Sequence, residues 1–487
     1  MSYKVGIIGS GVAGLASAIR LAIAGHHVEV FEANAYPGGK LSEIKLGAYR
    51  FDAGPSLLTL PSLIDELFEL AGENPAQYFT YQKLEINCEY FFPDGVNISA
   101  HADHEKLIEE IIQNTAERPE NVRKALAKSR LLYEHLSELF MFSSLQDLKT
   151  FVSRHAFKAY RKLHRLGFFQ TMNGANASTF DDPRITQMFN RYATYNGSSP
   201  YKTPATMNII PHLEMSLGAY FPAGGMHSIT LALYSLAKRL GVIFHFNQPV
   251  ERILIEKGHV KGLMTGGLSL DFDRLVSNMD IVNSYRKLMP DLKAPKFLLN
   301  QPKSSSALIF YWGVGKKFPQ LDLHNILFSR DYKAEFEHIF QRGAIFNDPT
   351  VYINITSKYE PSDAPEHGEN WFTMINVPNN QGQNWEELIT EARKNILDKI
   401  TATLGEDIAP LIEVEEILDP RTIESKTSSA LGALYGNSSN NLFAAFLRHA
   451  NKSRRVKGLY FCGGSVHPGG GIPMSLSSAK LVAKYFH

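Results

Sequence analysis

The sequence predicts an α/β fold whose main parallel sheet is assembled from separate stretches of the chain. Three observations support this prediction. An apolar run, Val5 to Ile8, leads directly into a glycine-rich turn; a second glycine-containing segment at 221–226 precedes helix-like and strand-like patterns; and the segment from 458 onward returns to a strand, a glycine run and a helix. With 487 residues, 44% of them hydrophobic, the chain is long enough for more than one core.

The turn after the first strand has the spacing GxGxxG at residues 9–14. Glycines here let backbone amides approach a pyrophosphate, and the following helix presents its positive N-terminal end. A helical pattern runs to Gly25, and a second strand then ends at Glu32, whose carboxylate we expect to bind a ribose. This arrangement predicts a dinucleotide site. Its phosphate-loop candidates are Gly9, Gly11, Val12, Ala13 and Gly14.

A second glycine pair, Gly38 and Gly39, followed by Lys40, comes shortly after the expected ribose acid. A nicotinamide cofactor does not need this pair, which lets the chain fold back over a longer, buried ligand. Together with GxGxxG and Glu32, the pair resembles the amine oxidase and carotenoid desaturase group of flavoproteins. The resemblance implies FAD as the cofactor. It also implies cofactor contacts from Gly54, Pro55, Ser56, Leu57, Val250 and Asn278.

The organisation of the rest of the chain follows from its periodicity. Residues of about 60 to 215 are predicted to be mainly helical, and a β-hairpin is predicted at 250–265. Residues of about 290 to 425 mix strand-like runs with a long helix near Trp385 to Leu404. We expect a discontinuous Rossmann-like FAD-binding domain at 1–60, 215–285 and 425–487. A mixed α+β substrate domain is expected at 61–214 and 286–424, including a helical, membrane-associating region at about 120–180.

The glycine-rich stretch 458–473 resembles the signature of bacterial-type phytoene dehydrogenases. Val466 and Gly470 depart from that signature, which carries threonine or alanine at the first position and a small non-glycine residue at the second. A helix starting near Pro473 is expected to aim its N-terminus at the N1/C2 edge of a flavin, where reduction places negative charge. The resemblance assigns Gly463, Gly464, Gly471 and Ile472 to the cofactor, and His467 is the candidate catalytic residue.

Two further segments, 54–59 and 89–95, look more like 1-hydroxycarotenoid 3,4-desaturases than phytoene desaturases. The resemblance implies a lipophilic carotenoid substrate, hydride transfer to the flavin, and oxygen or a quinone as the electron acceptor. Three alternatives stay open. They are a phytoene desaturase, a flavin oxidase of an amine or a porphyrinogen, and a non-catalytic relative similar to the Rab GDP dissociation inhibitors, which bind prenyl groups and proteins.

The sequence offers no paired carboxylates for acid and base catalysis, so geometry is expected to matter more than a named base. One polar side chain is expected to bind a terminal hydroxyl group of the substrate, because a site that bonds a hydroxyl discriminates strongly against the analogue that lacks it. The candidate substrate-binding residues are Arg191, Tyr195, His212, Glu214 and His227.

The formal net charge of +1 gives no general attraction for nucleic acid, so no nucleic-acid partner is expected. The two cysteines, Cys88 and Cys462, form no CxxC motif, so we expect no metal site and a reducing, cytoplasmic compartment. Residues 148–180 contain no acidic side chain. Basic residues on one side of a predicted helix there suit an anionic surface of the cytoplasmic membrane, bound peripherally, although an amphipathic helix packed on the core has the same pattern. They are Arg154, Lys158, Arg161, Lys162 and Arg165.

Overall fold

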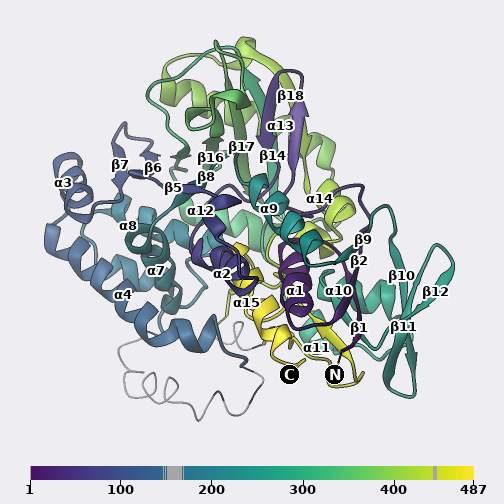
Figure 1. Cartoon of the computed structure of the whole chain (residues 1–487). Coiled ribbons are helices and arrows are strands. Elements are labelled where there is room, and N and C mark those ends of the chain that lie inside the picture. The colour runs from purple at the N-terminus through teal and green to yellow at the C-terminus, as the bar shows by residue number, and fades with distance from the viewer. Residues whose placement is uncertain are drawn as a thin grey trace.

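A computed structural model describes residues 2–145, 147, 150, 167, 169–441 and 447–486 (Figure 1). The basic stretch around Arg154 to Arg165, for which we predict membrane contact, lies outside the described residues. Over the described ranges, no helix is both long enough and apolar enough to cross a bilayer.

A five-stranded parallel sheet has the order β19-β13-β1-β2-β9, and its strands come from the beginning, the middle and the end of the chain. In register, Val5 lies opposite Arg274 on one side and Val28 on the other. The strands are β1 (Lys4–Ile8), β2 (His27–Phe31), β9 (Ile243–His245), β13 (Arg274–Ser277) and β19 (Leu459–Phe461).

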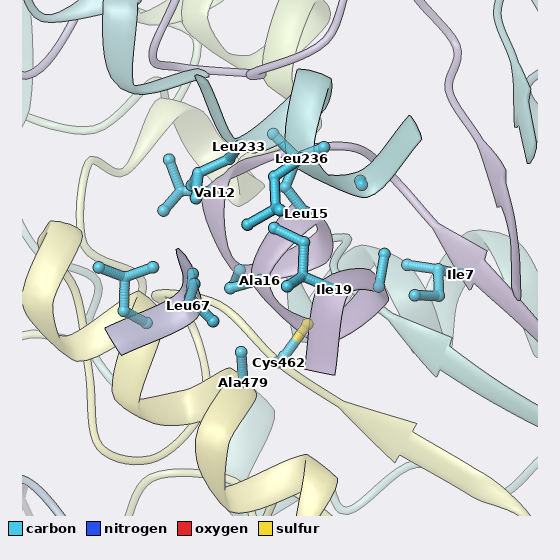
Figure 2. Packing of buried hydrophobic residues seen from close by; sticks show 14 of the residues in the cluster. Ile7, Val12, Leu15, Ala16, Ile19, Leu67, Leu233, Leu236, Cys462 and Ala479 are labelled. Atoms are coloured by element: carbon cyan, nitrogen blue, oxygen red, sulfur yellow. The ribbon is translucent and has the colours of Figure 1, made fainter. Parts of the chain in front are cut away.

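Helix α1 (Val12–Ile23) packs between α9 (His227–Arg239) and α15 (Ile472–Ala483) on this sheet. Figure 2 shows Leu15 beside Leu233 and Leu236 of α9. Ala16 and Ile19 continue the apolar contact toward Cys462 and Ala479. Because these side chains come from all three stretches of the chain, the first helix and the last are held in one core.

A three-stranded antiparallel sheet extends from the edge of this region (Figure 1). Its first two strands confirm the hairpin predicted at 250–265, since Val250 pairs with Thr265 and Glu256 with His259. The strands are β10 (Val250–Glu256), β11 (His259–Thr265) and β12 (Leu268–Asp271).

A seven-stranded sheet with the order β18-β14-β17-β16-β15-β6-β7 forms the second large layer. Its pairings are antiparallel except for β15 with β6. The long helix α13 (Trp385–Leu404) has the predicted bounds, and its Ile396 and Ile400 are buried in one core with Trp312. The strands are β6 (Ile86–Phe91), β7 (Asn97–His101), β14 (Ser306–Val314), β15 (His324–Leu327), β16 (Val351–Ile355), β17 (Glu369–Val377) and β18 (Ile412–Leu418).

The expectation that residues of about 60 to 215 are mainly helical was wrong for residues 81–101. That segment contributes the short β5 (Tyr81–Lys83) as well as β6 and β7. In β7, only Ile98 and Ala100 are apolar and buried, because this strand lies at the edge of the sheet. So short an alternation gives a weak sequence signal. The remaining strands are β3 (Glu43–Leu46), β4 (Tyr49–Asp52) and β8 (Tyr220–Pro222).

The other helices are distributed around the two large sheets (Figure 1). The α-helices are α2 (Ser62–Leu70), α3 (His104–Asn114), α4 (Pro119–Phe140), α7 (Met172–Ala177), α8 (Pro183–Asn190), α10 (Ile281–Asn283), α11 (Lys296–Leu299), α12 (Tyr332–Glu337) and α14 (Pro420–Thr427). The short 3₁₀ and π helices are η1 (Pro75–Gln77), η3 (Arg191–Asn196), η4 (Ala205–Ile209), η5 (His212–Leu217), η6 (Ser284–Leu288), η7 (His338–Arg342), η8 (Thr356–Lys358), η9 (Pro361–Asp363), η10 (Ala409–Leu411) and η11 (Ala430–Gly432).

Candidate functional site

A cavity of about 1020 Å³ is lined by residues of both large sheets. On one side it meets the carboxyl ends of the parallel strands, at Gly9, Glu32, Asn278 and Gly463. On the other side it meets side chains of the seven-stranded sheet, such as Phe372 of β17. Ligands of parallel α/β sheets bind in the crevice outside the carboxyl ends of the strands.

The turn between β1 and α1 requires glycine at particular positions. Gly9 has φ +92°, and its N–H donates to Phe31 O at 2.8 Å. A Cβ on Gly14 would lie 2.1 Å from Gly9 O, so only glycine lets α1 start this close to the strand. Gly14 is therefore a packing residue behind the cavity wall. The other candidates of the loop, Gly9, Gly11, Val12 and Ala13, line the cavity.

Glu32 lies directly after β2, is 5% exposed, and lines the cavity. Its Oε2 accepts hydrogen bonds from the N–H and the hydroxyl of Ser10, at 2.8 and 2.7 Å. Its Oε1 accepts from the N–H and the side-chain amide of Asn34, both at 2.9 Å. The carboxylate is thus held in place by both loops, at the position where a ribose contact is predicted.

The second glycine pair packs against the phosphate loop. Gly38 N–H donates to Ser10 O at 2.9 Å, and a Cβ on Gly38 would lie 2.4 Å from Leu41 O. Lys40 donates from Nζ to Leu434 O at 2.9 Å. Burial lowers the pKa of Lys40 to about 8, against the opposing effect of Asp280. Lys40 therefore fastens the C-terminal segment over the site.

Helix α15 begins at the wall of the cavity. Gly471, the residue immediately before the helix, has φ +95°, and a Cβ there would meet nothing within 4 Å. The free backbone N–H groups of this 12-residue helix make a positive end that suits an electron-rich ligand. Gly470 departs from the family signature because Tyr435 takes the space, and a Cβ would lie 2.7 Å from Tyr435 Cδ1.

The predicted cofactor residues therefore form one continuous wall that fits a dinucleotide. All of them except Gly14 line the cavity. Those not already described are Gly39, Gly54, Pro55, Ser56, Leu57, Val250, Asn278, Gly463, Gly464 and Ile472.

His467, the catalytic candidate, is not among the described residues that line the cavity. It is 1% exposed, and its Nε2 lies 2.7 Å from Ser143 O, to which the ring donates. Burial lowers the pKa of His467 to about 4, so the ring is neutral. A contact with a backbone carbonyl indicates a scaffold residue, and we assign His467 no chemical step.

Three of the five substrate-binding candidates form one buried cluster in the cavity wall. Arg191 donates to Glu214 Oε1 at 2.5 Å and to the Tyr195 hydroxyl at 3.0 Å. Glu214 also accepts from Tyr192 at 2.7 Å and from Tyr195. The remaining guanidinium nitrogen of Arg191 donates to Tyr90 at 2.5 Å. The charges of this cluster are satisfied within it.

The two histidines among these candidates lie apart from the cluster. His227 lines the cavity at the start of α9, and its Nδ1 lies 3.6 Å from Glu43 Oε2. The ring of His212 packs on Tyr133, 4.9 Å between centroids. His212 is not among the described lining residues, so the structure does not bring it to the site.

Several lining residues were missed by the sequence analysis: Asn87, Cys88, His324, Glu335 and Tyr352. They belong to strands β6, β15 and β16, to α12, and to no motif. A periodic pattern places such residues in the core without telling which of them face a ligand.

Comparison with known proteins identifies the family. The family model described as "Flavin containing amine oxidoreductase" matches residues 12–485. The chain is 52% identical over 480 residues to a 1-hydroxycarotenoid 3,4-desaturase of Flavobacterium sp. (strain P99-3), covering 99% of this chain and 98% of that protein. It is 30% identical over 504 residues to a phytoene desaturase of Fusarium fujikuroi, covering 98% and 88%.

A solved structure with the same fold is that of an oxidoreductase from Methanosarcina mazei. The TM-score is 0.64 at 17% identity, over 99% of this chain and 100% of that one. The family match covers the seven-stranded sheet, the C-terminal helix and all of the predicted cofactor residues except Gly9 and Gly11. The chain belongs to the family of flavin-containing amine oxidoreductases, and FAD is its cofactor.

Proposed function

We propose that this protein is an FAD-dependent desaturase that introduces a carbon–carbon double bond into a carotenoid, by 3,4-desaturation of a 1-hydroxycarotenoid. The observation that carries the proposal is the 52% identity with the Flavobacterium enzyme of that name, over almost the whole chain. The phytoene desaturase of Fusarium fujikuroi is much less similar, at 30% identity, which favours the hydroxylated substrate.

The walls of the cavity support a lipophilic substrate. Beyond the cofactor cradle, the lining is largely apolar and aromatic, with side chains from the seven-stranded sheet and α12. A polyene gains free energy by transfer from water to such a surface, about 25 cal/mol per Å². These apolar lining residues include Ile309, Ile326, Tyr332, Phe336, Phe372 and Met374.

The bound FAD supplies the hydride acceptor. The chain contributes binding and orientation: the phosphate loop would hold the pyrophosphate of the cofactor, and the N-terminus of α15 would face its flavin. The positive N-terminal end of α15 would favour negative charge on the edge of the flavin that it faces. The carboxylates of Glu214 and Glu335 are both held by hydrogen bonds to protein groups, so we assign no base. Arg191, Tyr195, Glu214 and His227 remain proposed substrate contacts.

The experiment that tests this function is pigment analysis after expression in cells that make a defined acyclic carotenoid, with and without a 1-hydroxylated form of it. The expected result is a product one double bond longer, formed from the hydroxylated precursor in strong preference to the unhydroxylated one. If the enzyme converts phytoene and not the hydroxylated carotenoid, it is a phytoene desaturase and the proposal is wrong. Activity on an amine or a porphyrinogen, with neither carotenoid converted, would replace it by an oxidase.

The electrons are proposed to pass from the flavin to oxygen or to a quinone. Reoxidation of the reduced purified enzyme, followed by flavin absorbance, separates the two. Rapid reoxidation by air, with no response to an added quinone, favours oxygen. Slow reoxidation by air, with rapid reoxidation by an added quinone under argon, favours the quinone.

We also propose a peripheral position at the cytoplasmic membrane, on the basis of the basic stretch from Arg154 to Arg165 in the sequence. The test is flotation with liposomes that contain anionic lipid. Replacement of the five basic residues by glutamine is expected to abolish flotation. Flotation that persists would move the membrane contact to another part of the chain.

A further inference from the structure

Three side chains of the cavity wall hold polar atoms without a hydrogen-bond partner anywhere in the described part of the chain: Asn87, His227 and His324. His227 Nδ1 lies 3.6 Å from a carboxylate oxygen of Glu43, whereas Asn87 and His324 come from two paired strands of the seven-stranded sheet. Asn87 is 2% exposed, and neither its Oδ1 nor its Nδ2 is bonded. His324 is 4% exposed, and its Nε2 is unbonded. Both residues line the cavity. Leaving such a buried group unpaired costs about 1–3 kcal/mol, so these atoms are available to bond a polar group of a ligand.

Neighbouring strands place the two residues at the same end of the sheet. β15 runs parallel to β6 with Asn325 opposite Glu89, so His324 and Asn87 both lie near the starts of their strands. The ladder between β6 and β7 shifts register between Ile86 and Cys88. Asn87 is the additional residue at this irregularity, where a strand re-aims its side chains. This explains why the successive residues Asn87 and Cys88 both line the cavity.

The hydrogen bonds around His324 determine which of its nitrogens carries the proton. Asn354 Nδ2 donates to Leu323 O at 2.9 Å and to His324 Nδ1 at 3.2 Å, so Nδ1 is an acceptor. Burial and the charge of Arg191 lower the pKa of His324 to about 3, so the ring is neutral. The proton is therefore on Nε2. His324 offers the cavity one donor, and Asn87 offers it both a donor and an acceptor.

We propose that Asn87 and His324 bind the tertiary hydroxyl group of the substrate and make the enzyme specific for it. This inference rests on the proposed function and names the residues that select its substrate. The hydroxyl hydrogen is donated to Asn87 Oδ1, and the hydroxyl oxygen accepts from His324 Nε2. A hydrocarbon end leaves these buried groups unpaired and is rejected for that reason.

The connection to the cofactor loop supports this position. The hydroxyl of Tyr352 lies 2.7 Å from His324 Nδ1 and 2.7 Å from Ser56 Oγ. Ser56 belongs to the segment 54–57, which lines the cofactor side of the cavity. In a 3,4-desaturation, the reacting carbons are only two and three bonds from the carbon that carries the hydroxyl group. The hydroxyl site would therefore lie beside the flavin, and Tyr352 links His324 to Ser56 of the predicted cofactor segment.

The Arg191–Glu214 pair is the competing candidate for this role. Each of its charged atoms already has a partner within the cluster, so none of them is left unpaired when a substrate without a hydroxyl group binds. The unbonded atoms of Asn87 and His324 have no such partner. The unpaired side chains are therefore the better hydroxyl site.

The test compares the FAD-loaded enzyme with Asn87→Leu and His324→Phe, using a 1-hydroxycarotenoid and the same polyene without the hydroxyl group, both in detergent. The measured quantity is the ratio of kcat/KM for the two substrates. Each variant is expected to lower this ratio by about 10- to 100-fold, the equivalent of one lost buried hydrogen bond. The matched control is Thr373→Val, which removes an unpartnered buried oxygen outside the described cavity lining and should leave the ratio unchanged.

Binding gives a second measurement. The hydroxylated carotenoid should raise the melting temperature of the wild-type enzyme more than the hydrocarbon does, and this difference should vanish in both variants. If Asn87→Leu fails to fold, Asn87→Ala replaces it, because it adds no bulk. Variants that keep the wild-type preference would overturn the inference and leave the proposed function intact. A wild-type enzyme that converts neither carotenoid would overturn both.

Discussion

Glu32 fastens the phosphate loop to the end of β2 through Ser10. One carboxylate oxygen accepts both the backbone N–H and the hydroxyl of Ser10, at 2.8 and 2.7 Å, and the other oxygen accepts from Asn34. Together with the side-chain amide of Asn34, four protein donors bond the four lone-pair positions that the carboxylate can offer. The acid expected to bind the ribose also builds the loop that binds the pyrophosphate.

Glu32→Ala is therefore expected to lower FAD affinity at least 10-fold, because Ser10 loses both bonds and the loop loses its support. Hydrogen bonds to a charged group contribute about 1.5–3 kcal/mol each. The ratio of flavin to protein absorbance after gel filtration and the Kd of FAD are the measurements. Glu29→Gln is the control, since Glu29 lies on the same strand but pairs with Lys4 and His245 away from the cavity. Full flavin content in Glu32→Ala would contradict the prediction.

Gly470→Ala is expected to destabilise the protein, although it restores the small side chain typical of the family signature. Its Cβ would lie 2.7 Å from Tyr435 Cδ1, and overpacking of this kind costs about 1–3 kcal/mol. The free energy of unfolding of the FAD-free protein is the quantity to measure. The same substitution in a Tyr435→Ala background should cost much less. An equal cost in both backgrounds would show that Tyr435 is not the obstacle.

The cofactor side of the site was predictable because its signals are local. Gly9 to Gly14 and Glu32 belong to one strand–helix–strand unit, and glycine spacing reports backbone geometry directly. The C-terminal contribution of Gly463 to Ile472 was found by resemblance to a family signature. Among these residues, Gly14 packs closely against Gly9 O and lies behind the cavity wall. A glycine required by such packing gives the same sequence signal as one that contacts a ligand.

The substrate side was not predictable in the same way. β15 begins with His324 and Asn325, two polar residues that are more typical of a loop. Both are buried, and their side chains form hydrogen bonds with Asn354, Asp322 and Ile353. Asn87 faces the cavity because of a register shift between β6 and β7. Both placements depend on strand neighbours distant in the sequence, which no local pattern reports.

Glu335 is expected to make stability depend on pH. Burial raises the pKa of Glu335 from 4.5 to about 7, although both carboxylate oxygens bond to Thr350. Between these values the folded protein retains a proton that the unfolded chain has lost. The free energy of unfolding should therefore fall as the pH rises from about 4.5 to about 7, by on the order of 3 kcal/mol.

Glu335→Gln imitates the protonated side chain and should flatten this part of the profile, with a higher melting temperature than wild type at pH 8. Denaturation of the FAD-free protein from pH 4.5 to pH 8.5 is the measurement. Glu337→Gln, which removes a half-buried carboxylate from the same helix, serves as the control. A profile for Glu335→Gln that matches wild type would assign the pH dependence to other groups.

Breaking the Arg191–Glu214 pair is expected to cost far more than removing it whole. The side chains are 7% and 2% exposed, so Glu214→Gln leaves the Arg191 charge buried without its partner, at a cost of about 3–5 kcal/mol. The double variant Arg191→Met/Glu214→Leu should be less destabilised than the sum of its single variants, because neither charge then stays unpaired. Urea denaturation of all four proteins measures the coupling. Additive costs would mean that the two charges do not depend on each other. As a comparison, Asp181→Asn breaks the pair with Arg118, whose side chains are 49% and 66% exposed, and should change stability little.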